Sequence, residues 1–278
     1  ADSTSSALEA LLIDLGPQIQ RGASISHSQG EWAAEGPQHC ATGLVELDAR
    51  LGGGFPRGRL SEICGPPSSG RTALALTLVG ATLRQGSLAG WIDLADAFDP
   101  ISASASGVDL ERLLWIRPRS QQQALRSCDR LLQTEGFELI VFDCVLPERI
   151  GPAKNGPGNG SDPAQMTSIR DVAWLRLSRL AAKTRTALVV LSQTAPSQPA
   201  STQASATGSR AELVLEMQPL GARFVGPPSL LETLETTVVL RRHRTRPSGI
   251  EIPISIHVEE DAAGSDHDQI DVSVDPER

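Results

Sequence analysis

Two hydrophobic patterns alternate along the middle of the chain. Short apolar runs without internal alternation predict buried strands at residues 59–64, 88–94, 113–117, 138–143 and 186–193. Segments with apolar residues every three or four positions predict helices at 72–85, 120–134 and 162–183. Buried strands separated by helices are typical of a parallel sheet covered on both faces. The sequence therefore predicts an α/β domain with a mainly parallel, twisted sheet.

The pattern changes after residue 193. Strand-like segments follow without helices between them, at 213–217, 235–241 and 250–258, so we expect the sheet to end in an antiparallel extension. Residues 259–278 contain eight carboxylates and a single Arg278, a composition that predicts a solvated, disordered acidic tail. The core domain is therefore expected to span residues 39–258.

The N-terminal residues 1–38 are predicted to form one short helix followed by a polar linker. Apolar residues at Leu8, Leu11, Leu12 and Leu15 form one stripe on a helix at 6–20. This stripe predicts a contact with a neighbouring subunit or a partner protein, and packing on the chain's own core is the alternative.

Composition restricts the function classes. Apolar residues make up 40% of the chain but aromatic residues only 3%, so the core must consist mostly of aliphatic side chains. The net charge of −8 argues against a protein wrapped broadly around nucleic acid. No apolar run approaches the roughly 18 residues that span a bilayer, and no secretory-signal pattern is present. The four cysteines are widely spaced, which favours free thiols in the cytoplasm over a zinc site or disulfides.

The segment 65–72, Gly-Pro-Pro-Ser-Ser-Gly-Arg-Thr, lies between a predicted strand and a predicted helix. In this context it matches a P-loop, whose glycines turn backbone N–H groups toward phosphates at a helix N-terminus. An ordinary turn between strand and helix is the alternative. The candidate cofactor-binding residues of the loop are Gly65, Pro66, Ser68, Ser69, Gly70, Arg71 and Thr72.

Two further features concern the metal and the phosphates. Thr72 and Asp143, which ends the strand at 138–143, are the candidate Mg²⁺ ligands. Arg71 stands where a P-loop has lysine, and its guanidinium is longer, planar and forked. It either binds an anion or fills the phosphate pocket with its own charge. We therefore expect ATP or ADP with Mg²⁺ to bind weakly or not at all.

Several collinear segments resemble the core of the bacterial RecA recombinase. They are residues 42–44, 51–59, 65–72, 91–93, 99–100, 107–109, 123–125, 128–129 and 191–193. The resemblance runs from about residue 42 to 258 and implies a RecA-like P-loop NTPase fold. It also implies that Gln193 corresponds to the glutamine that senses the γ-phosphate in that family.

The departures from this resemblance concern hydrolysis. The glutamate that orients the attacking water in RecA falls at Ala95, whose methyl group cannot orient water. Together with Arg71, this indicates that two parts of the hydrolytic machinery are missing. The alternative is that Asp93 or Asp96 supplies the missing carboxylate.

The DNA-binding and filament surfaces depart as well. RecA's DNA-binding loops correspond to residues 151–163 and 195–209, which contain Lys154 as their single basic residue and no aromatic residue. We therefore expect weak or no binding of single-stranded DNA. Arg241, Arg242 and Arg244 fall where RecA has lysines that reach a neighbour's nucleotide. They predict contact with a RecA subunit or self-association, and a solvated strand end is the alternative.

A RecA-like core with these losses resembles the ImuA-type (RecA/SulA-like) accessory proteins of bacterial SOS mutagenesis. The resemblance implies a degenerate ATPase that serves as scaffold or modulator in translesion synthesis, with RecA or polymerase subunits as partners. One alternative is a divergent DNA-dependent ATPase or recombinase of the RecA family that binds single-stranded DNA. A second is a cell-division inhibitor of the damage response.

Overall fold

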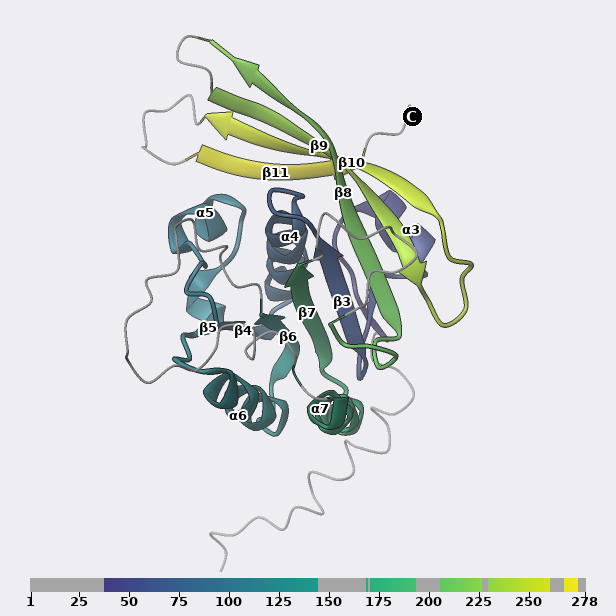
Figure 1. The fold of residues 1–278 in the computed structure, drawn as a ribbon. Coiled ribbons are helices and arrows are strands. Elements are labelled where there is room, and N and C mark those ends of the chain that lie inside the picture. The colour runs from purple at the N-terminus through teal and green to yellow at the C-terminus, as the bar shows by residue number, and fades with distance from the viewer. Residues whose placement is uncertain are drawn as a thin grey trace, which may run out of the picture. The chain divides into compact units, whose positions relative to one another are not determined.

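The predicted α/β class is confirmed by the computed structural model, which describes residues 38–144, 169, 171–193, 206–226, 230–260 and 268–274. A nine-stranded sheet runs in the order β11-β10-β9-β8-β3-β7-β6-β4-β5 (Figure 1). Its strands are β3 Leu60–Gly65, β4 Leu88–Asp93, β5 Leu113–Ile116, β6 Phe137–Asp143, β7 Ala187–Gln193, β8 Leu213–Val225, β9 Leu230–Arg242, β10 Glu251–Glu260 and β11 Asp268–Val274.

The sheet has a parallel part and an antiparallel part. Strands β8, β3, β7, β6, β4 and β5 are parallel neighbours. Strands β9, β10 and β11 continue the sheet in antiparallel pairs beyond β8, and Figure 1 shows them passing above α4 and α5. The expected antiparallel extension is therefore confirmed.

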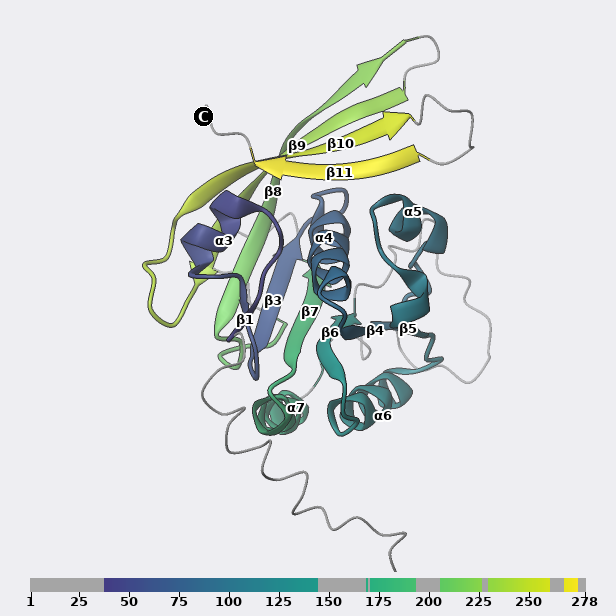
Figure 2. The same cartoon turned by 180° about the vertical axis from the view of Figure 1, so that it is seen from behind.

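Helices cover both faces of the parallel part. They are α3 Val45–Leu51, α4 Arg71–Arg84, α5 Pro100–Ala105, α6 Gln121–Leu132 and α7 Asp171–Thr184. One core includes Val141 of β6 and the buried residues of α3, α4 and α5. Its counterpart on the other face contains Phe142 and the buried residues of α6 and α7. Neighbouring residues of one strand enter opposite cores, because successive side chains point to opposite faces. The ribbons show α6 and α7 on the other side of the parallel strands from α4 (Figures 1 and 2).

The prediction of a disordered tail over 259–278 is wrong for β11. Residues 268–274 form a strand whose register with β10 places Val258 opposite Ile270. Without β11 the backbone groups of β10 on that side would be unpaired, and pairing gives them partners within the sheet. Strand formation here depends on an edge provided by a distant segment, which charge composition does not reveal.

Other boundaries differ from the predicted ones by a few residues. Helices α3 and α5 were not predicted from the pattern, since each covers only 6 or 7 residues. Strands β8 and β9 are 13 residues long, more than predicted. The predicted N-terminal helix lies outside the described residues. None of the described helices is long and apolar enough to cross a membrane.

Gly54 directly precedes β2 (Phe55–Pro56), which pairs with β1 (His39–Cys40) in a small second sheet. Its φ is +109°, and a Cβ added there would lie 2.2 Å from the carbonyl oxygen of Cys40. We expect Gly54→Ala to lower the free energy of unfolding in urea by about 3 kcal/mol or more, through backbone strain and clash. Gly86→Ala is the matched control, because Gly86 has φ +86° but open space around it. It should cost roughly 1–2 kcal/mol, and equal losses would contradict the close approach.

Candidate nucleotide-binding site

The carboxyl ends of three parallel strands bring the candidate residues together. Gly65 of β3 pairs with Gln193 of β7. Asp143, the last residue of β6, pairs with Leu191 of β7. Parallel strands end at the same edge of a sheet, where ligands bind in open α/β folds. The structure thus places the loop, Asp143 and Gln193 at one edge.

The loop between β3 and α4 has the backbone of a tight turn. Ser68 has φ +55° and Gly70 has φ +86°, and α4 begins at Arg71. Ser68 is exposed, Pro66 is half-buried and Ser69 is buried. The Ser69 hydroxyl has no hydrogen-bond partner among the described residues. The loop therefore retains the geometry of a strand-to-helix anion site.

The antiparallel extension packs directly against this loop. Thr236 of β9 donates a hydrogen bond from its hydroxyl to the carbonyl oxygen of Ser69 at 3.0 Å. A Cβ on Gly70 would lie 2.4 Å from Ile256 Cδ1 of β10, and one on Gly65 would lie 2.6 Å from the carbonyl oxygen of Met217 in β8. At Gly65 the backbone of β8 occupies the space that a side chain would fill, and at Gly70 the φ of +86° favours glycine.

Arg71 points away from solvent and across the edge. Arg71 is 9% exposed, and its guanidinium donates a hydrogen bond to the carbonyl oxygen of Ser192 in β7. Burial lowers the pKa of the Arg71 guanidinium, and the negative charge of Asp143 opposes that shift. The guanidinium remains charged at neutral pH. This hydrogen bond ties Arg71 to its own chain, and the two roles left open for it, anion binding and filling of the phosphate pocket, remain predictions.

Glu62 is a central residue that the sequence analysis did not identify. It is fully buried in β3. Its carboxylate accepts hydrogen bonds from the Ser192 hydroxyl at 2.6 Å and from the backbone N–H groups of Ala206 and Thr207 at 2.8 and 3.2 Å. The available signal was a glutamate inside the apolar run Leu-Ser-Glu-Ile-Cys. Charged residues are seldom buried unless their hydrogen bonds are satisfied.

Comparisons with known proteins agree with this fold and loop. A family model described as RecA N-terminal domain matches residues 7–195. The chain belongs to the RecA family. It is 36% identical over 188 residues to Protein RecA of Herpetosiphon aurantiacus, covering 67% of this chain and 52% of that protein. It is 40% identical over 142 residues to Protein RecA of Rubrobacter xylanophilus, covering 51% and 41%.

A solved structure of the RadB recombinase superposes with a TM-score of 0.58 at 22% identity, covering 79% of this chain and 96% of that one. This likeness shows the RecA-like fold. The chain spans about half the length of the curated relatives it matches.

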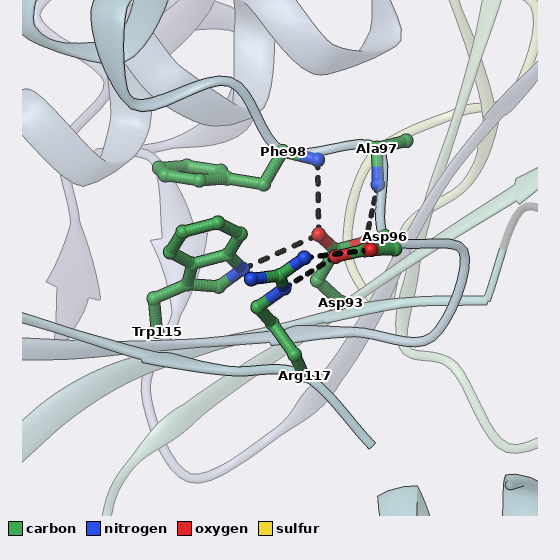
Figure 3. A network of polar contacts seen from close by, with 6 residues as sticks. All are labelled: Asp93, Asp96, Ala97, Phe98, Trp115 and Arg117. Atoms are coloured by element: carbon green, nitrogen blue, oxygen red, sulfur yellow. Dashed lines mark hydrogen bonds and ion pairs between the residues drawn. The ribbon is translucent and has the colours of Figure 1, made fainter. Parts of the chain in front are cut away.

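Around Ala95, the two carboxylates that could replace the RecA glutamate have other partners (Figure 3). Asp93 is buried and accepts hydrogen bonds from the N–H groups of Ala97 and Phe98 and from Nε1 of Trp115, at 3.0, 2.9 and 3.2 Å. Asp96 forms a two-point ion pair with Arg117, whose guanidinium lies 4.9 Å from the centre of the Trp115 ring. These contacts fix both carboxylates in place.

The arginines predicted to reach a neighbour lie at and just beyond the end of β9. Arg241 forms an ion pair with Glu216 of β8. Arg242 donates hydrogen bonds to the carbonyl oxygens of Gly208 and Ala211, at 2.8 and 3.3 Å. Arg244 is exposed. Two of the three are thus occupied within the chain, and contact with a second subunit remains a prediction.

The residues at this edge do not fit a magnesium-bound nucleotide as they are placed. Thr72 is exposed at the start of α4, as a metal ligand would be. Asp143, however, lies close enough to Arg71 for their charges to interact, so its carboxylate is already compensated by a cation of the chain itself. Arg71 has one nitrogen bonded to Ser192, so only its remaining donors could turn toward a phosphate. The described residues contain no cluster of His, Cys, Asp or Glu suited to a metal ion.

The remaining predicted residues lie outside the described part of the chain. They are Leu8, Leu11, Leu12 and Leu15 and most of the two segments that correspond to the DNA-binding loops of RecA.

We expect Glu62→Gln to lower the free energy of unfolding in urea by about 3 kcal/mol. The amide NH₂ group replaces one acceptor oxygen and points two N–H donors at groups that are themselves donors. Glu232→Gln is the matched control, since Glu232 is a half-exposed partner of Arg223. It should change stability by less than about 1 kcal/mol. A comparable effect of the two substitutions would show that Glu62 does not organise the edge.

Proposed function

We propose that this chain is an accessory protein of the bacterial DNA-damage (SOS) response. In this proposal a RecA-family domain that no longer hydrolyses ATP efficiently acts in the cytoplasm as a scaffold or modulator for translesion synthesis. Its partners are RecA, polymerase subunits, or both. The observation that carries the proposal is the buried guanidinium of Arg71, bonded to Ser192 at the edge where RecA-family proteins handle phosphates.

The loss of hydrolysis follows from two positions. Arg71 commits part of its guanidinium to a backbone carbonyl of its own chain, so fewer of its donors are left to stabilise charge on a transferring phosphoryl group. Ala95 stands at the position of the water-orienting glutamate. Nearby Asp93 and Asp96 are held by backbone N–H groups, Trp115 and Arg117, which leaves neither poised as a general base.

A protein without turnover and with few basic residues in its DNA loops must act through protein contacts. Binding of DNA without sequence preference requires cationic side chains and stacking aromatics, and the segments 151–163 and 195–209 offer Lys154 alone. The leucine stripe at Leu8, Leu11, Leu12 and Leu15 is a candidate partner surface. Exposed Arg244 is a second candidate.

The second candidate function is a divergent DNA-dependent ATPase of the RecA family. The observation in its favour is the retained loop geometry, with Gly70 at φ +86° and Thr72 exposed at the helix start. In that case the donors of Arg71 that do not bond Ser192 would have to bind phosphate at each cycle. The two functions predict different kinetics.

The wild-type protein should release phosphate from ATP with Mg²⁺ at the rate of a buffer blank, with and without single-stranded DNA. Arg71→Lys combined with Ala95→Glu should raise the rate by about 10²-fold or more, because both parts of the machinery return. A steady-state phosphate-release assay measures both proteins. DNA-stimulated turnover by the wild type, to which the double variant adds little, would establish the ATPase instead.

Leu11→Asp combined with Leu15→Asp should abolish association with purified RecA while shifting the thermal midpoint by less than about 2 °C, as surface substitutions do. Biolayer interferometry measures the association and scanning fluorimetry the midpoint. Val45→Asp is the matched control, because Val45 is an apolar residue of the core domain that is 84% exposed. Parallel loss of binding and stability in the double variant would show that the stripe packs on its own core.

A further inference from the structure

The residues at the carboxyl edge of the sheet do not fit a magnesium-bound nucleotide, and Arg71 lies at the same edge. We propose that the guanidinium of Arg71 is a resident cation that takes the place of a divalent metal at the carboxyl edge of the sheet. The edge then keeps one arrangement in the absence of metal and does not respond to Mg²⁺. The inference rests on the proposed function, because it treats the edge as a site that no longer cycles a nucleotide.

The position of Arg71 supports this role. The side chain starts at the first residue of α4 and ends at Ser192 of β7. Ser192 directly follows Leu191, the residue that pairs with Asp143 at the end of β6. The charge of Arg71 therefore lies at the junction of the loop, β6 and β7, beside the carboxylate that would otherwise face a metal.

The buried carboxylates at the edge favour a nearby cation. Asp143 is buried with 6% exposure and Glu62 with 0%. A buried carboxylate without a nearby positive charge is costly, even when hydrogen bonds satisfy its oxygens. Ser192, Ala206 and Thr207 are neutral donors of hydrogen bonds to the carboxylate of Glu62. The guanidinium of Arg71 supplies positive charge to this buried region, as a metal ion would.

The shape of the guanidinium explains why lysine would not serve. Arginine carries five N–H donors in a planar fork, so it can bond the Ser192 carbonyl and still direct charge toward Asp143. A lysine ammonium is a single, more strongly hydrated point on a shorter chain. Arg71→Lys should therefore leave Asp143 less well compensated and open the position to a divalent ion.

Ser192 extends the effect of Arg71 beyond the edge. Its carbonyl oxygen accepts from Arg71, and its hydroxyl donates to Glu62 at 2.6 Å. Glu62 in turn binds the N–H groups of Ala206 and Thr207. One residue therefore links the guanidinium to the chain that leads into β8. Because the cation is covalently part of the protein, this linkage does not depend on ligand concentration.

The test compares thermal midpoints of the full chain in EDTA, in Mg²⁺, and in ADP with each. The wild-type midpoint should differ by less than about 1 °C between EDTA with ADP and Mg²⁺ with ADP. Arg71→Lys should have a lower midpoint in EDTA and should regain about 5 °C or more with Mg²⁺ and ADP, the shift expected of saturating ligand. Arg84→Lys, on the exposed end of α4, is the matched control and should behave as the wild type.

Two results would overturn the inference. One is a wild-type midpoint that rises with Mg²⁺ and ADP, and the other is a folded Arg71→Lys protein as insensitive to Mg²⁺ as the wild type. If Arg71→Lys does not fold, the thermal midpoint of Asp143→Asn in EDTA and in Mg²⁺ tests the inference. A resident cation predicts the same loss of midpoint in EDTA and in Mg²⁺, whereas a loss seen only with Mg²⁺ would make Asp143 a metal ligand.

The outcome is separable from that of the proposed function. ATP turnover by the wild type would contradict the proposed function. A wild-type midpoint that depends on Mg²⁺ without turnover would contradict the resident cation alone.

Discussion

A positive charge buried at the carboxyl ends of parallel strands is the constraint on which the functional edge depends. Arg71 donates to the Ser192 carbonyl and faces Asp143. Charges removed from water are tolerated only when they are paired and hydrogen-bonded. The loop, β6 and β7 are thereby fixed relative to one another by groups of the protein itself. In P-loop enzymes the corresponding groups are left free for phosphate and metal.

The neighbouring elements reinforce this fixed arrangement. Glu62 holds Ser192 and the chain at Ala206 and Thr207. On the other side of the loop, Thr236 binds the Ser69 carbonyl and Ile256 packs against Gly70. A site that must open and close is usually built from weakly held segments. Here buried contacts surround the loop and hold its backbone in one arrangement.

The residues that follow β4 are also held by contacts within the chain. Asp93 and Asp96 lie next to the position of the RecA glutamate, yet each is committed to local contacts with Phe98, Trp115 or Arg117 (Figure 3). Trp115 belongs to a small aromatic group with Trp91 and Phe98. The ring centre of Phe98 lies 5.1 Å from that of Trp91 and 5.2 Å from that of Trp115. These contacts stabilise the turn after β4 by packing and hydrogen bonding.

The sequence by itself determined the alternation of the parallel strands with α4, α6 and α7, the position of the phosphate loop and the replacement of its lysine, because hydrophobic period and loop spacing are local properties. It did not determine where Arg71 points, since its partner Ser192 is 121 residues away. It also missed the role of Glu62, whose partner Thr207 is 145 residues away, and strand β11, which forms by pairing with β10. Only the tertiary structure decided these features, because a buried charge or an open strand edge takes its partner from whatever the fold brings beside it.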